Sequence, residues 1–392
     1  MTRVLSVIHH PSFGGPHNQV LRLDEPLRRR GFATLAVVPD EPGSAFERLR
    51  TGGVDVVRMR LGRLRARMDW RLQVRMLRAI AGDVRRLTSL IDRQGIDLVV
   101  LHGLTNPQGA IAARVGGRPL VWQILDTRTP GPLRYALAPL VRGLSATVMT
   151  TGRAVADAHP GVPQAPDRLF TYYPPVDTGL FAPDDEDRRR IRESFSWTPD
   201  DLVVGCVANL TPQKKLETFV DVARAVCRAR ENVRFAIFGA PMTSQEAYAA
   251  GLLARADDLV AGNRLLQVPV SGDVARHVRA LDVFLATAGP RSEGISTTIL
   301  EAMSTGVPVV STDVGAIREA LEHGIHGFLV PPSDSAALER SVLRLVDDGA
   351  LRARMGAASR ERATRAFDVE RCADVHARAF EAALSRGAWT SR

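Results

Sequence analysis

The chain has almost no lysine and almost no cysteine. Lysine occurs only at Lys214 and Lys215, although 52 basic residues stand against 43 acidic ones and the formal net charge is +9. The three cysteines, Cys206, Cys227 and Cys372, lie far apart and lack the spacing of a metal site. A disulfide scaffold is therefore excluded, and buried, reduced thiols are expected, as is typical of a cytoplasmic protein.

Long apolar runs are also missing. No run approaches the roughly 18 residues that a membrane-spanning helix needs. The apolar run near the N-terminus, 3–8, is too short for a signal peptide and is better interpreted as a first strand. We therefore expect a cytoplasmic location. The composition, 45% hydrophobic and 24% charged, is that of a globular protein, and 392 residues suggest two or three domains.

Short apolar segments alternate with helical patterns on both sides of a segment rich in proline and aspartate at 174–187. The predicted strands are 3–8, 33–38, 54–59, 97–102, 119–125, 146–150, 168–173, 202–208, 233–239, 264–270, 282–287, 307–312 and 327–331. Because the strands alternate with helices, each half is expected to form a parallel sheet covered on both faces. A helix is predicted near 17–30, and the last part of the chain predicts helices 334–347, 350–366 and 368–385.

The segment 289–308, GPRSEGISTTILEAMSTGVP, combines hydroxyl side chains with two carboxylates ahead of an apolar helical pattern. Thr298 and Glu301 have the spacing of a capping box, which predicts a helix that begins near Thr297 or Thr298. Glu301 is then expected in the first turn and Glu293 in the loop before it. A helix N-terminus is a favourable place for a phosphate group, and carboxylates can accept hydrogen bonds from sugar hydroxyls. The segment therefore favours a nucleotide sugar as ligand. The alternative is that Glu301 only caps the helix while Glu293 is a solvated loop residue.

The lysine pair suggests a second contact with phosphate. Lysine is a compact point charge on a flexible stem, whereas arginine is a planar fork. A site that touches a single phosphate oxygen can therefore prefer lysine, and Lys214 and Lys215 interrupt a chain that otherwise uses arginine. Chance in an arginine-rich composition is the alternative.

Ligands of parallel α/β sheets bind beyond the carboxyl ends of the strands. This places the turn at 9–18, the segment after His102 and the segment around Asp126 on one rim. Gly14 and Gly15 in that turn would let ligand atoms approach the backbone. The histidines that flank it, His9, His10 and His17, are more often surface or packing residues than catalytic ones.

The segment 58–93 is rich in arginine with interleaved apolar residues. We favour a solvated outer helix whose inner face packs on the sheet. The alternatives are peripheral contact with the anionic inner face of a membrane or attraction of an acidic acceptor. No nucleic-acid-binding module accompanies the segment, so nucleic acid is not an expected partner.

Several motifs together resemble one known family. The most specific is SEGISTTILEAMSTGVPVVSTDVGAIREAL at 292–321, continued by EHGIHGFLVPPSD at 322–334. Three further segments fit the same family: ANLTPQKKLETFV at 208–220, PSFGGPHNQV at 11–20 and YPPVDTGLF at 173–181. These motifs resemble those of the retaining glycosyltransferases of family 4, which have the GT-B fold.

The resemblance implies an α/β architecture of two Rossmann-like parallel-sheet domains that face each other across a cleft. Residues 1–176 would form an N-terminal domain that binds the acceptor, and 177–367 a C-terminal domain that binds the nucleotide sugar. Residues 368–392 would form a C-terminal helix that packs back on the N-terminal domain.

The resemblance also implies roles for single residues. Lys214 would neutralise the donor diphosphate, Glu301 would hold the ribose, and Glu293 would contact the donor sugar. The other implied donor-binding residues are Gly15, Asn209, Gly294, Ile295, Ser296 and Thr297. The family needs no metal or other cofactor, because basic side chains and a helix terminus stabilise the departing phosphate.

Two positions depart from the family pattern. Asn209 replaces an arginine that partners the lysine, and Arg291 is a candidate substitute. Leu125 stands where a histidine is common, so Asp126 is placed beside Lys214 and Glu293 as a candidate catalytic residue. His9, His102 and Arg291 remain candidates for acceptor or accessory contacts.

The expected function is transfer of a sugar from a UDP- or GDP-sugar to an acceptor hydroxyl, with retention at the anomeric carbon. A lipid-linked or envelope glycan acceptor and a soluble natural product both stay open. The alternatives are a nucleotide-sugar epimerase or phosphorylase, and a non-catalytic partner protein. The joint presence of Lys214, Glu293 and Glu301 argues against the last, because a dead site would have no reason to keep all three.

Overall fold

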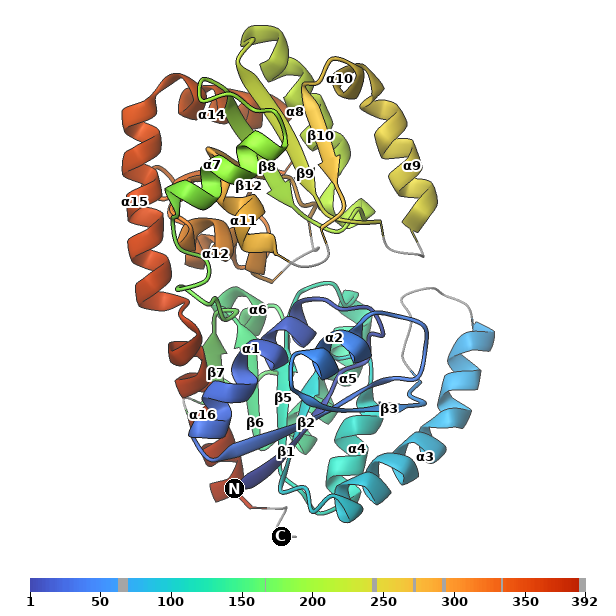
Figure 1. Cartoon of the computed structure of the whole chain (residues 1–392). Coiled ribbons are helices and arrows are strands. Elements are labelled where there is room, and N and C mark those ends of the chain that lie inside the picture. Colours follow the sequence, from blue (N-terminus) through green and yellow to red (C-terminus); the bar gives the residue numbers. More distant parts are fainter. Residues whose placement is uncertain are drawn as a thin grey trace. The chain divides into compact units, whose positions relative to one another are not determined.

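The structure, a computed structural model, describes residues 1–62, 70–165, 167–241, 245–270, 273–290, 294–332 and 334–387, with the side chains of 70–78 left out. The chain divides into two compact units (Figure 1). The first consists of Met1–Pro175 with Val369–Arg392, and the second of Val176–Asp368. The chain thus passes from the first unit to the second after Pro175 and returns after Asp368.

The first unit is built on a seven-stranded sheet in the order β3-β2-β1-β4-β5-β6-β7, and every pairing is parallel. Its strands are β1 (Thr2–Val7), β2 (Phe32–Pro39), β3 (Asp55–Met59), β4 (Leu98–His102), β5 (Leu120–Ile124), β6 (Thr147–Thr151) and β7 (Leu169–Tyr172). Its helices are α1 (Gly15–Arg29), α2 (Ala45–Thr51), α3 (Trp70–Arg93), α4 (Pro107–Val115), α5 (Gly131–Leu144), α6 (Arg153–Asp157) and α16 (Val369–Ser385).

The core of this unit joins distant parts of the chain. The central strands β4, β5 and β6 are buried along their whole length, as expected for parallel strands covered on both faces. Helix α16 packs beside α1. The rings of Phe380 in α16 and Phe32 in β2 meet in an edge-to-face contact, with 5.3 Å between the ring centroids. The last helix therefore completes the core of the first unit.

The second unit contains a six-stranded parallel sheet in the order β10-β9-β8-β11-β12-β13. Its strands are β8 (Leu202–Val207), β9 (Val233–Phe238), β10 (Leu265–Val268), β11 (Val283–Ala286), β12 (Val309–Thr312) and β13 (Gly327–Val330). Its helices are α7 (Asp185–Ser194), the 3-10 helix η1 (Pro212–Lys214), α8 (Leu216–Ala229), α9 (Glu246–Arg255), α10 (Asp257–Ala261), α11 (Val274–Arg279), α12 (Thr297–Ser304), α13 (Ile317–Ala320), α14 (Ser335–Asp347) and α15 (Gly349–Ala366).

The strand order reverses once in each sheet. In the first unit β1, β2 and β3 extend outward, and β4 then returns to the other side of β1. In the second unit β8, β9 and β10 do the same before β11 returns beside β8. The loops that leave such a pair of strands diverge, which opens a crevice at the carboxyl ends of the strands.

The predicted α/β class with two parallel sheets is confirmed, and each predicted strand overlaps an observed one. The predicted capping box is wrong. Helix α12 begins at Thr297 with Ser296 as its N-cap, so Glu301 is the fifth helical residue and lies in the second turn. Thr298 is already helical, and its hydroxyl lies 3.1 Å from the Ser296 hydroxyl instead. The Thr-x-x-Glu spacing misled because the same pattern also fits inside a helix.

The segment 58–93 is described in part. Residues 63–69 and the side chains of 70–78 lie outside the described structure. In the described end of α3, Leu87, Leu90 and Ile91 are buried, while Arg85 and Arg86 are exposed. This end of the helix therefore has the packed inner face and solvated outer face that the sequence favoured.

Candidate functional site

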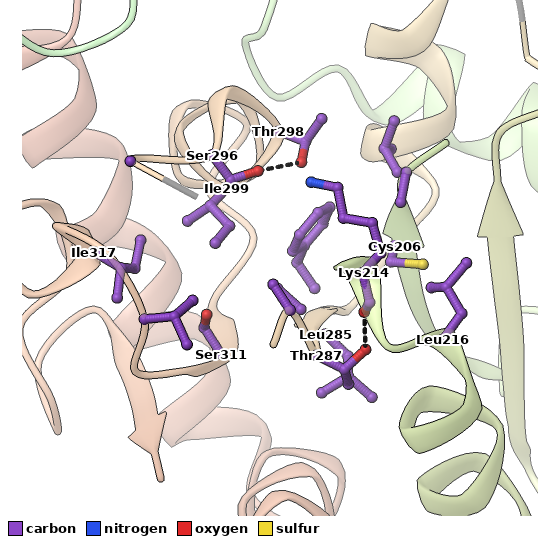
Figure 2. Close-up of a pocket in the computed structure, with 17 residues that line it drawn as sticks. Cys206, Lys214, Leu216, Leu285, Thr287, Ser296, Thr298, Ile299, Ser311 and Ile317 are labelled. Atoms are coloured by element: carbon purple, nitrogen blue, oxygen red, sulfur yellow. Dashed lines mark hydrogen bonds between the residues drawn. The ribbon is translucent and has the colours of Figure 1, made fainter. Parts of the chain in front are cut away.

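A pocket lies at the carboxyl edge of the second sheet, where β8, β11 and β12 end and α12 begins (Figure 2). This is the edge at which the strand order reverses. Its lining consists of Cys206, Val207, Ala208, Lys214, Leu216, Phe284, Leu285, Ala286, Thr287, Ala288, Gly294, Ser296, Thr298, Ile299, Ser311, Val314 and Ile317. We call it the Lys214 pocket.

Lys214 is held in place by its backbone. It ends the short helix η1 in the connection between β8 and α8, and Lys215 after it adopts a left-handed conformation with φ 49°. The Thr287 hydroxyl, directly after β11, bonds to the carbonyls of Lys214 at 2.9 Å and Lys215 at 3.0 Å. Gly289 N–H donates to the Gln213 carbonyl at 2.9 Å. The η1 turn is therefore tied to the end of β11.

The start of α12 forms the opposite wall. The Lys214 side chain extends toward Ser296 and Thr298 (Figure 2). The first N–H groups of a helix have no intrahelical acceptor, and the Ser296 side chain caps none of them. Gly294 is fixed because its carbonyl accepts from Ala316 N–H at 2.8 Å. A cationic side chain and a helix N-terminus thus meet at one place, which suits an anion.

The electrostatics of the described lining favour the same ligand. Lys214 is the only basic group among the described lining residues, and no carboxylate stands in that described lining. Burial raises the pKa of the Cys206 thiol to about 12, and the positive charge of Lys214 opposes this only in part. The thiol is therefore neutral at physiological pH, and the described lining carries net positive charge.

The structure brings some of the predicted donor residues together. Lys214, Gly294 and Ser296 line the pocket. Ile295, Thr297 and Glu301 follow in the chain but are not part of the lining, and Glu301 is 3% exposed. Asn209, two residues after β8, is exposed. Glu293 and Arg291 lie outside the described residues.

The other predicted residues belong to the first unit and lie at the carboxyl edge of its sheet. His9 follows β1, and its Nδ1 bonds to the carbonyl of His102 at the end of β4, at 2.9 Å. A Cβ atom at Gly15 would meet no protein atom within 4 Å, and its φ is not positive, so neither sterics nor backbone conformation explains this glycine. Asp126 follows β5, is half-buried, and accepts from Arg128 N–H at 2.9 Å. Leu125 packs against the core.

Sequence reasoning missed three polar residues of the pocket, Thr287, Thr298 and Ser311. A signal for Thr287 was present, because it is the last residue of the predicted strand 282–287, which ends at this edge. For Thr298 the predicted capping role concealed its place in the lining.

The described residues show neither a metal-binding cluster nor a membrane-spanning helix. They contain no group of three or more His, Cys, Asp or Glu side chains that could hold a metal ion. They also contain no helix long and apolar enough to span a membrane.

Each of the two units matches a glycosyltransferase family model. Residues 14–169 match the model described as "Glycosyl transferase 4-like domain". Residues 187–362 match the model described as "Glycosyl transferases group 1". The two matches cover most of the chain: the first includes strands β2 to β6, and the second includes β8 to β13.

Comparison with known proteins gives relatives that are named as glycosyltransferases or mannosyltransferases. The lipopolysaccharide core biosynthesis mannosyltransferase LpsB of Rhizobium meliloti is 30% identical over 62% of this chain and 68% of LpsB. D-inositol 3-phosphate glycosyltransferase 1 of Catenulispora acidiphila is 28% identical over 64% of this chain and 63% of that protein. A GDP-mannose-dependent alpha-(1-6)-phosphatidylinositol monomannoside mannosyltransferase of Mycolicibacterium smegmatis is 29% identical, over 70% and 74%.

Solved structures share the fold. Anabaena HepE in complex with UDP-glucose has a TM-score of 0.78 and 20% identity, over 96% of this chain and 98% of that one. Sucrose-phosphate synthase from Thermosynechococcus elongatus has a TM-score of 0.78 and 16% identity, over 99% and 100%. At these identities the likeness concerns the fold alone.

Proposed function

Because the chain belongs to glycosyltransferase family 4 and has the GT-B fold, we propose that it moves a sugar from a UDP- or GDP-sugar to an acceptor hydroxyl, with retention at the anomeric carbon. One observation supports this position for the donor site. Lys214 and the start of α12 line the same pocket, at the edge of the sheet where the strand order reverses. We take this pocket as the site of the donor diphosphate.

The proposed chemistry relies on positioning and on stabilisation of charge. The bond from the anomeric carbon to the diphosphate oxygen breaks, and a bond from the acceptor oxygen forms on the same face. The acceptor proton passes to the departing phosphate oxygen. Lys214 and the N–H groups at the start of α12 would stabilise the charge that develops on the diphosphate. This assigns to the protein the work that a metal ion performs in other transferases.

The remaining donor contacts are proposals that rest on the family resemblance. Glu301 would bind the ribose, and Glu293 with Asp126 would act near the sugar. Glu301 is 3% exposed, so its role requires a ligand hydroxyl to reach the second turn of α12. The open space around Gly15 is compatible with a ligand passing close to that backbone. The exposed amide of Asn209 would supply a hydrogen bond where relatives supply a cation.

The names of the relatives suggest which classes of donor and acceptor to propose. One relative is named as dependent on GDP-mannose, and one neighbouring structure holds UDP-glucose, so neither nucleotide is preferred on this ground. The names of the relatives mention lipopolysaccharide core biosynthesis, D-inositol 3-phosphate and phosphatidylinositol monomannoside. We therefore propose a glycan or glycolipid as acceptor, and a soluble natural product as the alternative.

Thermal unfolding in the presence of UDP, GDP and inorganic phosphate tests the donor site. A nucleotide that binds only the folded protein raises the midpoint in proportion to the logarithm of its concentration. We expect one nucleoside diphosphate to raise the midpoint more than phosphate does. If neither nucleotide shifts the midpoint at millimolar concentration, the donor site is wrongly placed.

Lys214→Ala tests the proposed role of the ammonium group. Removing one group that stabilises developing charge costs about 100- to 1,000-fold in turnover, and we expect a loss of this size in transfer or in slow donor hydrolysis. The matched control is Lys215→Ala, which removes the exposed neighbouring charge and should keep most of the activity. Equal losses in both variants would contradict a specific role for Lys214.

Contact with an anionic membrane is proposed for the arginine-rich segment 58–93. The exposed arginines at the described end of α3 support it, as do relatives whose names mention phosphatidylinositol. Each basic side chain near such a surface contributes about 1 kcal/mol, which salt screens. Co-sedimentation with vesicles containing phosphatidylserine should decrease as salt rises and should be absent with neutral vesicles. Binding that salt does not weaken would rule out this mode.

A further inference from the structure

The connection between β4 and α4, residues 103–106, is bordered by buried polar groups that have no hydrogen-bond partner among the described residues. They are Nδ1 of His102, both amide atoms of Asn106 and Oε1 of Gln108. The three side chains are 1%, 0% and 1% exposed. Buried polar groups are nearly always paired in folded proteins, so several unpaired ones on one short stretch need an explanation.

Of the three residues, Asn106 gives the strongest evidence for a ligand. It is the N-cap residue of α4, where an asparagine side chain ordinarily accepts a hydrogen bond from the first turn. Here the side chain makes no cap bond, and neither its oxygen nor its nitrogen has a partner among the described residues. The residue forgoes its usual stabilising role and keeps a donor and an acceptor buried.

His102 and Gln108 are each anchored at one end only. The Nε2 atom of His102 bonds to the Ser6 hydroxyl at 2.7 Å, which leaves Nδ1 without a partner among the described residues. Gln108 donates from Nε2 to the Gly62 carbonyl, which leaves Oε1 unpaired in the same part of the chain. Both side chains are therefore oriented by one bond while a second polar atom stays unused.

These groups lie at the edge where ligands of such sheets bind. His102 ends β4, whose neighbour β1 is the strand from which the order reverses. His9, which follows β1, contacts the His102 carbonyl at this edge. Position and unpaired atoms are independent observations, and both point to a ligand.

The chemistry of the cluster specifies the kind of ligand. An amide and an imidazole offer both donors and acceptors, and neither carries charge here, because burial lowers the pKa of His102 to about 3. Asp83 on α3, a helix that packs against α4, is already engaged by Gly62 N–H at 2.7 Å and by the Arg86 guanidinium. Hydroxyl groups both donate and accept, so they match this cluster better than phosphate or ammonium groups do.

We propose that His102, Asn106 and Gln108 form a subsite for a neutral, polyhydroxylated part of the acceptor, a sugar or a polyol. The inference rests on the proposed glycosyl transfer and names the class of acceptor. The polar atoms are buried, so binding requires the connection 103–106 to open. Gly103, with φ 85°, gives that connection a backbone conformation that other residues rarely adopt.

The experiment separates ligand binding from a structural role. Asn106→Leu keeps the approximate size of the side chain and removes the unpaired buried polar atoms, so the free energy of unfolding should increase. Binding of myo-inositol and methyl α-D-mannopyranoside is measured by saturation-transfer NMR on the full chain. We expect the variant to lose affinity for at least one probe by about tenfold, the equivalent of one neutral hydrogen bond. Asn106→Ser, which keeps a good N-cap residue, should show the same loss if Asn106→Leu does not fold.

Thr88→Val is the matched control. The Thr88 hydroxyl on α3 is also buried and has no partner in the described part of the chain. Its removal should likewise stabilise the protein but should leave probe binding unchanged. UDP and GDP binding is measured on every variant, so a failure of the donor proposal is seen separately.

The results decide the proposal. Higher stability with weaker probe binding in Asn106→Leu supports the subsite. Lower stability with unchanged probe binding would show that the amide holds internal water or a structural contact, and would overturn it. Absence of probe binding to the wild-type protein at millimolar concentration would overturn it as well, as would tighter binding of myo-inositol 1-phosphate than of myo-inositol.

Discussion

Three histidines of the first unit illustrate how much a single residue depends on its surroundings. Burial lowers the pKa of His17 to about 4, of His102 to about 3 and of His376 to about 4, from an ordinary 6.5. All three are therefore neutral in the folded chain at pH 7. Each contacts the backbone or another side chain through a ring nitrogen, as His17 does with the His10 carbonyl at 2.9 Å.

These histidines predict a loss of stability in mild acid. Below pH 6.5 the unfolded chain binds protons that the folded chain does not, so stability falls as the pH falls from 6.5 toward 4. Each buried histidine contributes about 1.4 kcal/mol per pH unit in this window, or about 4 kcal/mol for all three at about pH 5.5. Urea unfolding at pH 7 and at the lower pH measures the difference. His376→Gln should reduce the pH dependence of stability by about one bound proton.

The role of a residue could be predicted where it depends on nearby sequence, but its contacts with distant parts of the chain could not. The lysine pair stood out by composition alone, and Lys214 does line the pocket. By contrast, Gln19 of α1 lies 3.0 Å from His376, which is 357 positions away, and also accepts from Tyr172 at 2.8 Å. Nothing in the sequence near Gln19 signals this buried network, because tertiary packing determines which polar residues meet.

At the scale of elements, the position of a glycine in a helix determines the effect of replacing it. Gly356 in the middle of α15 packs against the loop after α12, and a Cβ atom there would lie 2.2 Å from the Gly306 carbonyl oxygen. The backbone oxygen cannot move away without shifting the end of α12. The glycine is therefore required by close packing between two helices of the second unit.

Gly356→Ala should destabilise the protein, although alanine is the better helix former by roughly 1 kcal/mol. We expect a loss of about 1–3 kcal/mol in the free energy of unfolding, typical of overpacking. The control is Gly251→Ala in α9, where a Cβ atom would meet nothing within 4 Å. That variant should gain about 0.5–1 kcal/mol. Stabilisation by both substitutions would contradict the packing argument.

Elements themselves were largely predictable, because apolar runs of strand length bounded by helical patterns are strong signals. The boundaries of the predicted helices also agree to within about two residues, but the capping roles of single residues were less predictable. The helix after Ser296 was expected near Thr297, but the role of Glu301 in its first turn was not borne out. Capping depends on the backbone conformation of one residue, which the spacing of side chains does not determine.

At the scale of the whole molecule, two points of the chain connect the units, and both are fixed within the second unit. Val176 N–H donates to the Phe367 carbonyl at 2.9 Å, and the Thr178 hydroxyl donates to Asp368 at 2.5 Å. Parallel sheets were predictable from alternation, but the adjacency of these two connections was not, because residues 176 and 368 carry no matching pattern.

Arg360 of α15 holds the first connection in place. Its Nη1 lies 2.8 Å from the Thr178 carbonyl, 2.9 Å from the Phe181 carbonyl and 2.7 Å from the Ser304 carbonyl at the end of α12. The Ser304 hydroxyl, which is buried, donates to the same Phe181 carbonyl at 2.7 Å. One guanidinium thus joins the connecting segment to α12, the helix whose start lines the Lys214 pocket.

Arg360→Met should cost about 2–4 kcal/mol, because it leaves more than one buried carbonyl without its charged donor. Arg360→Lys should recover part of the lost stability, because one nitrogen makes all three contacts and an ammonium group can donate to the same carbonyls. The control is Arg365→Met on the same helix, where the side chain is 69% exposed and pairs with Glu361 at 3.7 Å; a change within about 0.5 kcal/mol is expected. If urea unfolding gives the same small change for both arginines, the connecting segment is held by its own backbone bonds. If Arg360→Met alone lowers the free energy of unfolding and also weakens nucleotide binding, the connecting segment and the donor pocket are stabilised together through α12.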